Sequence, residues 1–123
     1  MTITTQVLVT DVAYGTASGN YDGSSQDWYS DAVPAANYYG GQGSLQTITY
    51  RLQNFVGIIK IQASLNDLKD SAAWFDIPEA TYGDGITTDT GTIPVNIVGN
   101  FTWLRAQILG FDAGSIQSIT AVY

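Results

Sequence analysis

The strongest constraint on the fold is the alternation of apolar and polar side chains in short runs. Within Ile58–Leu65, Ile59 and every second residue after it are apolar, whereas Lys60 and every second residue after it are polar. Successive side chains of a β-strand point to opposite faces, so this pattern predicts a strand with one buried face. The same pattern predicts strands over Thr4–Val12, Leu45–Gln53 and Phe101–Leu109.

Turn residues separate these runs along the whole chain. Glycine occurs 13 times in 123 residues, and Asn54–Gly57 and Gly110–Gly114 are typical of turns or bulges between strands. Shorter strands are predicted over Trp74–Ile77, Thr92–Val98 and Ser115–Tyr123. We therefore expect an all-β fold, an antiparallel two-sheet β-sandwich of jelly-roll-like type with seven or eight strands, forming a single domain over residues 1–123.

Residues 15–44 break the pattern and are rich in Gly, Ser, Asn, Asp, Ala and Tyr. This stretch is predicted to be one long loop or interaction segment. Aromatic residues among Ser, Gly and Asn are typical of adaptable recognition surfaces. Three interpretations stay open: the rings stack on sugars, they are buried against a neighbouring subunit, or they pack over their own sheet. The residues concerned are Tyr21, Trp28, Tyr29, Tyr38 and Tyr39.

Two further candidates stand on the predicted strand Phe101–Leu109. Trp103 and Arg105 are two residues apart and share a strand face, where a guanidinium group can lie over an indole ring. With the aromatic residues of 15–44 they form the predicted set of partner- or glycan-contacting residues. Core or inter-sheet packing is the expected role of Phe55, Trp74, Phe75 and Phe101.

Charged and reactive residues argue against catalysis and against polyanionic partners. The chain has no histidine and no cysteine, and its four basic residues face eleven acidic ones, for a net charge of −7. Nucleic acids and anionic membranes attract clustered Lys and Arg, which this sequence lacks. Most acids lie in predicted turns, so we expect no catalytic residues, no cofactor and no enzyme. Calcium at Asp84 and Asp89 is one interpretation of their loop, and an ordinary Asp-Gly turn is the other.

The segment Met1–Thr5 has neither the basic nor the apolar part of a signal peptide. No apolar run approaches the roughly 18 residues that a membrane helix needs. The sequence therefore predicts a protein that is made in the cytoplasm without a secretion signal.

Residues Asn54–Tyr123 contain blocks that resemble a known family of modules. The most specific blocks are Trp-Phe-Asp-Ile at Trp74–Ile77 and Gly-Asn-Phe-Thr-Trp-Leu-Arg at Gly99–Arg105. They resemble the small β-sandwich modules of virion proteins of tailed phages, especially those of large myoviruses. The first 53 residues carry no such resemblance.

The resemblance implies a non-enzymatic virion structural protein, with a capsid decoration subunit as the leading hypothesis. A tail, fibre or baseplate component is the first alternative. The implied partners are other virion proteins, such as the major capsid or tail proteins, together with further copies of this chain. The implied location is the virion. The aromatic residues support a second alternative, a carbohydrate-binding module that mediates host adhesion, with a host glycan as its partner.

Overall fold

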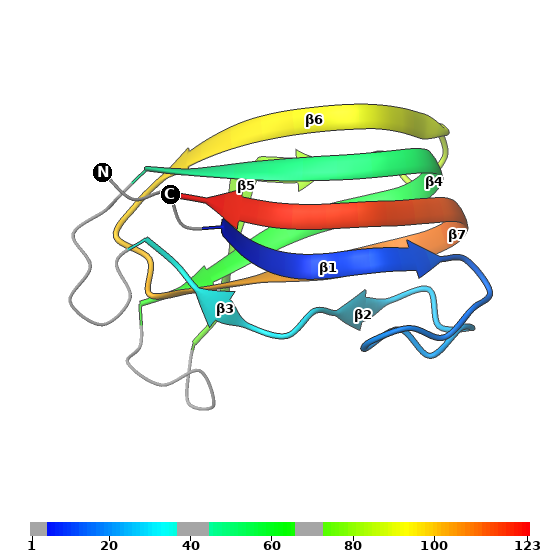
Figure 1. Cartoon of the computed structure of the whole chain (residues 1–123), viewed down its shortest axis with the longest axis horizontal. Helices are drawn as coiled ribbons and strands as arrows, with labels where there is room; N and C mark the ends of the chain where they lie inside the picture. Colours follow the sequence, from blue (N-terminus) through cyan, green and yellow to red (C-terminus); the bar gives the residue numbers. More distant parts are fainter. Residues whose placement is uncertain (1–4, 37–44, 66–72) are drawn as a thin grey trace.

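The computed structural model describes residues 5–36, 45–65 and 73–123, and its regular elements in these ranges are all strands. Figure 1 labels them. Their bounds are β1 Thr5–Ala13, β2 Trp28–Tyr29, β3 Val33–Pro34, β4 Leu45–Ser64, β5 Phe75–Tyr82, β6 Asp89–Val98 and β7 Trp103–Val122. In this part of the chain, no helix has the length and hydrophobicity to span a membrane.

All seven strands belong to one antiparallel sheet built on β4 and β7. These two strands have 20 residues each and pair with one another over most of their length. The first half of β4 also pairs with β6, and its second half pairs with β5. On the other side, β7 pairs with β2 and β3 near its start and with β1 near its end.

Both central strands bend at their midpoints and return along the molecule (Figure 1). The β4–β7 register shifts between Gln53 and Ile58, and Asn54 takes a left-handed backbone with φ of 52°. The opposing bend of β7 contains Gly110 and Gly114, with φ of 59° and 80°. Extra residues in a ladder increase its local bend and twist. The bends therefore divide the sheet into a first limb of β6, β4, β7 and β1 and a second limb of β5, β4, β7, β2 and β3.

Side chains from the two limbs meet in the core. Tyr50 from the first limb donates a hydrogen bond to the carbonyl of Ala80 on β5, and its ring stacks on Tyr82 with centroids 5.7 Å apart. At the bends, the rings of Phe55 and Phe111 lie 5.6 Å apart, and both residues are fully buried. Folding the sheet over thus removes the inner faces of both limbs from water, which is the main driving force for this arrangement.

The all-β, antiparallel prediction is confirmed, whereas the separation into two sheets of jelly-roll type stays a prediction. Asn54–Gly57 and Gly110–Gly114, predicted as turns or bulges between strands, are bends within β4 and β7, and the register shifts at Asn54–Gly57 agree with the bulge alternative. The strand predicted over Trp74–Ile77 begins at Phe75 and continues past Pro78 to Tyr82. Proline is tolerated there because β5 pairs only with β4, and its register shifts around that position.

Residues 15–36, the described part of the predicted long loop, lie against the sheet. Trp28–Tyr29 and Val33–Pro34 pair with β7, and Ser18 and Tyr21 form a small bridge. Most of these residues are in turns or irregular structure, as expected for a loop, but the short pairings with the β7 edge hold the segment against the sheet. Residues 37–44 lie outside the described part of the chain.

Candidate functional site

The outer face of the second limb carries a stack of one cation between two aromatic rings. The guanidinium carbon of Arg105 lies 4.3 Å from the centre of the Tyr29 ring and 4.4 Å from the centre of the Trp74 ring. Each ring face attracts the cation electrostatically. The stack therefore holds a long, flexible side chain in one position on the surface.

Strand register explains why these residues meet. Leu104 and Ala106 of β7 are fully buried, so Arg105 between them points outward. Arg105 pairs with Gln62 of β4, which in turn pairs with Asp76 of β5. Trp74 precedes Asp76 by two residues, and on the other side Tyr29 pairs with Gln107 of β7. Four neighbouring strands thus place their outward side chains side by side.

Hydrogen bonds connect the stack across those strands. The Nε of Arg105 donates to Oε1 of Gln62 at 2.7 Å, and the Nε2 of Gln62 donates to Oδ1 of Asp76 at 2.8 Å. The Nε2 of Gln107 donates to the hydroxyl of Tyr29 at 3.2 Å. We call this surface the arginine platform. It consists of Tyr29, Gln62, Trp74, Asp76, Arg105 and Gln107.

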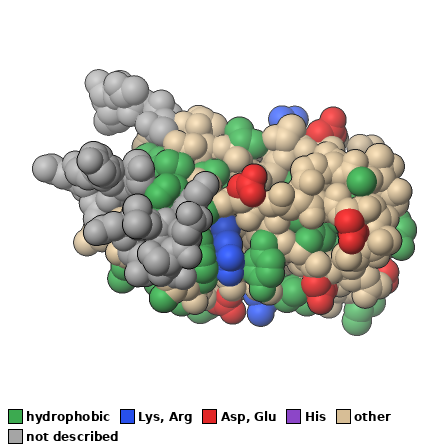
Figure 2. Space-filling view, turned by 90° about the horizontal axis from the view of Figure 1, so that it is seen from below, with side chains coloured by type: hydrophobic (Ala, Val, Ile, Leu, Met, Phe, Trp, Pro, Cys, Tyr) green, Lys and Arg blue, Asp and Glu red, His purple; other side chains and the backbone are tan. Residues whose placement is uncertain are grey.

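The platform has a fixed charge pattern. Burial lowers the pKa of Arg105 from its ordinary value, while Tyr29 opposes the shift, and the guanidinium stays protonated at neutral pH. Lys60 lies 3.8 Å from the carboxylate of Asp76 at the side of the platform. Figure 2 views the molecule from below and shows an elongated basic side chain among apolar ones, with acidic side chains close to it. Such a surface suits a partner with both apolar and hydrogen-bonding groups.

Two of the predicted contact residues are core residues instead. Tyr21 is 1% exposed and Trp28 is 7% exposed, and their rings lie 5.5 Å apart beside Phe111. A role in contacting a partner or glycan through exposed ring faces does not fit this burial. The cause is the pairing of β2 with β7, which turns Trp28 inward and Tyr29 outward.

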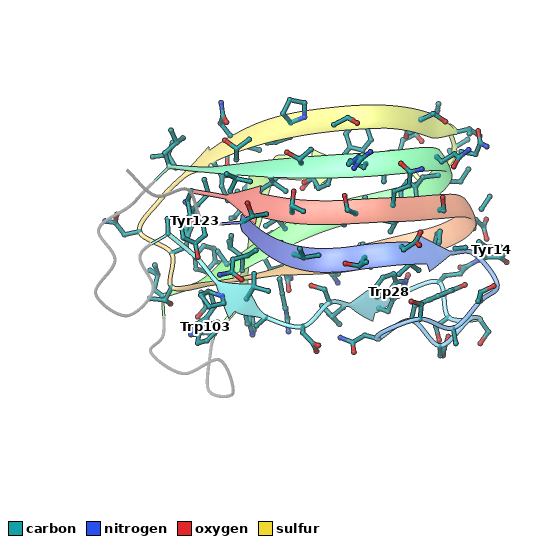
Figure 3. All side chains as sticks on the ribbon, viewed as in Figure 1. Tyr14, Trp28, Trp103 and Tyr123 are labelled. Atoms are coloured by element: carbon teal, nitrogen blue, oxygen red, sulfur yellow. The ribbon has the colours of Figure 1, made fainter. Side chains whose placement is uncertain are left out.

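The remaining predicted contact residues have different locations: some lie on the platform, one is largely buried, and two lie outside the described part of the chain. Tyr29 is 44% exposed and belongs to the platform with Arg105. Trp103 is largely buried at the end of the molecule opposite to Trp28 (Figure 3). The indole that stacks on Arg105 is Trp74, so the predicted pairing of Trp103 with Arg105 is wrong. Tyr38 and Tyr39 lie outside the described residues.

The residues expected to serve packing alone also differ in their surroundings. Phe55 is fully buried, as expected, and Phe101 packs against the core. Phe75 is exposed, with its ring 5.9 Å from that of Phe101, and Trp74 lies on the platform. Sequence reasoning missed the roles of Gln62, Asp76 and Gln107. Alternation placed Gln62 and Gln107 on outward faces, but only the register between strands reveals that they meet.

The aspartate side chains in the acidic loops accept hydrogen bonds mainly from residues of the same loop. Both carboxylate oxygens of Asp84 accept hydrogen bonds from Thr87, and the Ile86 amide also donates to this carboxylate. These bonds lower the pKa of Asp84 to about 2. Asp84 and Asp89 line one shallow surface depression, and Asp89 accepts a hydrogen bond from the hydroxyl of Tyr82. Among the described residues, no three acidic side chains gather in a way that suits a metal ion.

Asp22 repeats this arrangement in a second Asp-Gly loop. Its carboxylate accepts bonds from the amides of Ser24 and Ser25 and from their hydroxyls, which lowers its pKa to about 2. An aspartate that bonds to the backbone two and three residues ahead is a common turn-stabilising device. Both aspartates therefore have a structural explanation that needs no ligand.

The chain was compared with protein-family models, curated proteins and solved structures. No protein-family model, no curated protein and no solved structure matches the chain.

Proposed function

We propose that the protein is a non-enzymatic structural component of a phage particle, acting as a capsid decoration subunit that contacts neighbouring virion proteins. In this proposal the arginine platform is the contact surface. The protein's copies occupy equivalent positions on the particle, so each platform meets the same neighbouring surface.

The observation that carries the proposal is the meeting of two sequence blocks on one face. Trp74 belongs to the Trp-Phe-Asp-Ile block and Arg105 to the Gly-Asn-Phe-Thr-Trp-Leu-Arg block. The two residues are 31 positions apart in sequence, yet their side chains stack at 4.4 Å. The blocks that resemble virion modules thus build one surface. Tyr, Trp and Arg are also the residues enriched at protein interfaces.

The distribution of acids supports a role without catalysis. Asp22 and Asp84 are held in their ionised forms by their own loops, and Asp76 bonds to the platform. General acid–base catalysis needs a group that exchanges protons near the working pH, and the chain has no histidine. In this proposal Asp22 and Asp84 stabilise their turns, and Asp76 helps to hold the side chains of the platform in place.

We also propose that the folded sheet functions as a two-layer sandwich of jelly-roll type. The first limb forms one layer and the second limb forms the other, with the bends of β4 and β7 as the shared corner. The contacts of Tyr50 with Ala80 and of Phe55 with Phe111 support this description. A two-layer module of this kind presents the outer faces of both layers to partners.

Particle composition tests the proposal. Intact particles of a phage whose genome encodes the protein are purified on a density gradient. The copy number of the protein in each particle is then measured by quantitative mass spectrometry, relative to the major capsid protein. A fixed ratio that fits the capsid symmetry is expected. A fixed ratio that fits the tail instead identifies a tail, fibre or baseplate component, and absence from intact particles overturns the proposal.

Two matched variants test the platform as the contact surface. Tyr29→Ala removes one ring of the stack, whereas Tyr14→Ala removes a ring of similar exposure elsewhere (44% and 48%). Purified variants are added to particles that lack the protein, and bound copies are counted. We expect Tyr29→Ala to bind poorly and Tyr14→Ala to bind normally. Equal binding of both variants contradicts the role of the platform.

A further inference from the structure

A half-open pocket lies between β1 and the segment that carries β2 and β3. Its volume is about 360 Å³, near the lower end of the range of small-ligand sites, which is about 300–1,000 Å³. β1 lies at one end of the strand order, and four of its residues line this pocket. The lining residues are Leu8, Val9, Thr10, Val12, Ser18, Gly19, Asn20, Trp28, Ser30 and Asp31.

A bulge in β1 gives the pocket its apolar floor. The register with β7 shifts between Val7 and Val9, leaving Leu8 without a partner in the ladder. Neighbouring residues of a regular strand point to opposite faces, but Leu8 and Val9 are both buried and both line the pocket. Bulges often re-aim side chains next to functional sites.

Trp28 contributes a buried hydrogen-bond donor without a partner. The residue is only 7% exposed, and its Nε1 atom has no acceptor among the described residues. Buried polar groups in proteins almost always find a partner, because an unmet donor costs roughly 1–3 kcal/mol. The indole is among the side chains that line the pocket, and a ligand acceptor that reached Nε1 from there would satisfy this donor.

The rim is polar and carries no cation. Asn20 donates to the carbonyl of Tyr29 and to the carboxylate of Asp31, both at 3.0 Å, which orients its amide oxygen as an acceptor. Thr10 and Ser18 also line the pocket, but no Lys or Arg among the described residues does. With Asp31 at the rim and a net charge of −7, the pocket disfavours anionic ligands. Polar side chains at the rim and an apolar floor suit a neutral, hydroxyl-rich ring.

We propose that this pocket binds a neutral sugar residue, with a ring or hydroxyl oxygen accepting a hydrogen bond from Nε1 of Trp28. The proposal does not depend on the virion role, because the pocket and the arginine platform are formed by different residues. It also assigns Trp28 a role different from ring stacking, since the indole binds through its N–H while its ring stays in the core.

Nuclear magnetic resonance of the indole N–H groups tests the proposal directly. The chain has three tryptophans, and Trp28→Phe identifies the Trp28 signal by its loss. Glucose, galactose, mannose and N-acetylglucosamine are titrated separately at millimolar concentrations, with glucuronic acid as the anionic comparison. We expect a saturable shift of the Trp28 signal with at least one neutral sugar, and a smaller effect of glucuronic acid.

Two variants separate binding from folding. Trp28→Phe keeps an aromatic ring but removes the donor, and Thr10→Val removes a rim hydroxyl at nearly constant volume. Because Trp28→Phe lacks the indole signal, binding to the variants is followed by the backbone amide signals of Ser18 and Gly19, which line the pocket. We expect each variant to bind up to about tenfold more weakly, the effect of one hydrogen bond. Thr87→Val, outside the pocket, should bind as the wild type does. No saturable shift with any neutral sugar, or unchanged binding by Thr10→Val and Trp28→Phe, overturns the proposal and leaves water as the partner of the indole.

Discussion

Replacing Gly114 by alanine tests whether the paired bends of β4 and β7 determine the fold. A β-carbon at this position would lie 2.0 Å from the carbonyl oxygen of Asn54 and 2.2 Å from its carbonyl carbon. Both atoms belong to the opposing bend of β4, so no side-chain rotation relieves the overlap. Gly110 is the matched control, because it also has a positive φ, but a β-carbon there would have no atom within 4 Å.

The magnitude follows from strain and lost pairing. Either alanine costs about 1–2 kcal/mol for adopting the left-handed backbone. Gly114→Ala must in addition separate the bends where Gln53 pairs with Ser115 and Val56 pairs with Ala113. The carbonyl of Gly114 also accepts a hydrogen bond from the Tyr14 amide. Losing two or three such bonds adds about 2–3 kcal/mol, so we expect a total loss of about 3–5 kcal/mol.

Urea unfolding followed by circular dichroism and tryptophan fluorescence measures both variants. A loss of about 3–5 kcal/mol is a large part of the roughly 5–15 kcal/mol that stabilises a typical domain, so Gly114→Ala should be partly unfolded or unfold at much lower urea. Gly110→Ala should lose only about 1–2 kcal/mol. Equal losses in the two variants would contradict this prediction, because they would mean that the bends do not pack as closely as described.

Three further predictions concern the platform, the acidic loops and the core. Arg105→Met keeps the apolar stem but removes the cation, and should lower the free energy of unfolding in urea by about 1–3 kcal/mol; an unchanged value would contradict the stack. The pKa values of Asp22 and Asp84 are lowered from 3.8 to about 2, so the stability they supply is present above pH 3.8 and is lost as the pH falls through 2. Carboxyl NMR titration should give midpoints near 2 for both, and midpoints near 3.8 would show that the loop hydrogen bonds do not form. Tyr50→Phe leaves the buried carbonyl of Ala80 without its donor and should cost about 1–3 kcal/mol in urea unfolding. Burial also raises the pKa of Tyr50 above 10.0, so the wild type should lose stability as the pH rises past 10, and Tyr50→Phe should lose less.

The strands were predictable because alternation depends only on local sequence. Ile59 and Ile61 on β4 and Leu104 on β7 are fully buried, as their runs indicated. The positions of the bends were predictable but their nature was not, because the composition of Asn54–Gly57 is the same whether one strand ends there or a single strand bends and continues. What decides between them is the pairing of β4 with β7 on both sides of the bend. That pairing joins residues far apart in sequence, such as Gln62 and Arg105.

The candidate site was predictable only in part for the same reason. Tyr29 and Arg105 were recognised by residue type, but their partner Trp74 was assigned to packing. Trp28 was placed in the partner- or glycan-contacting set, with packing over its own sheet as an open alternative, and its pairing opposite Ile108 turns it into the core. A segment rich in Gly, Ser and Tyr has no periodicity that separates inward from outward residues. Its two short strands take their orientation from β7, which no local pattern records.

Cryo-electron microscopy of the intact particle is the decisive measurement for the virion role. We expect density for the bent seven-stranded sheet at symmetry-related positions on the capsid, with Tyr29, Trp74 and Arg105 buried against a neighbouring virion protein. Particles without this density, or density in which these three side chains face solvent, would contradict the proposed function.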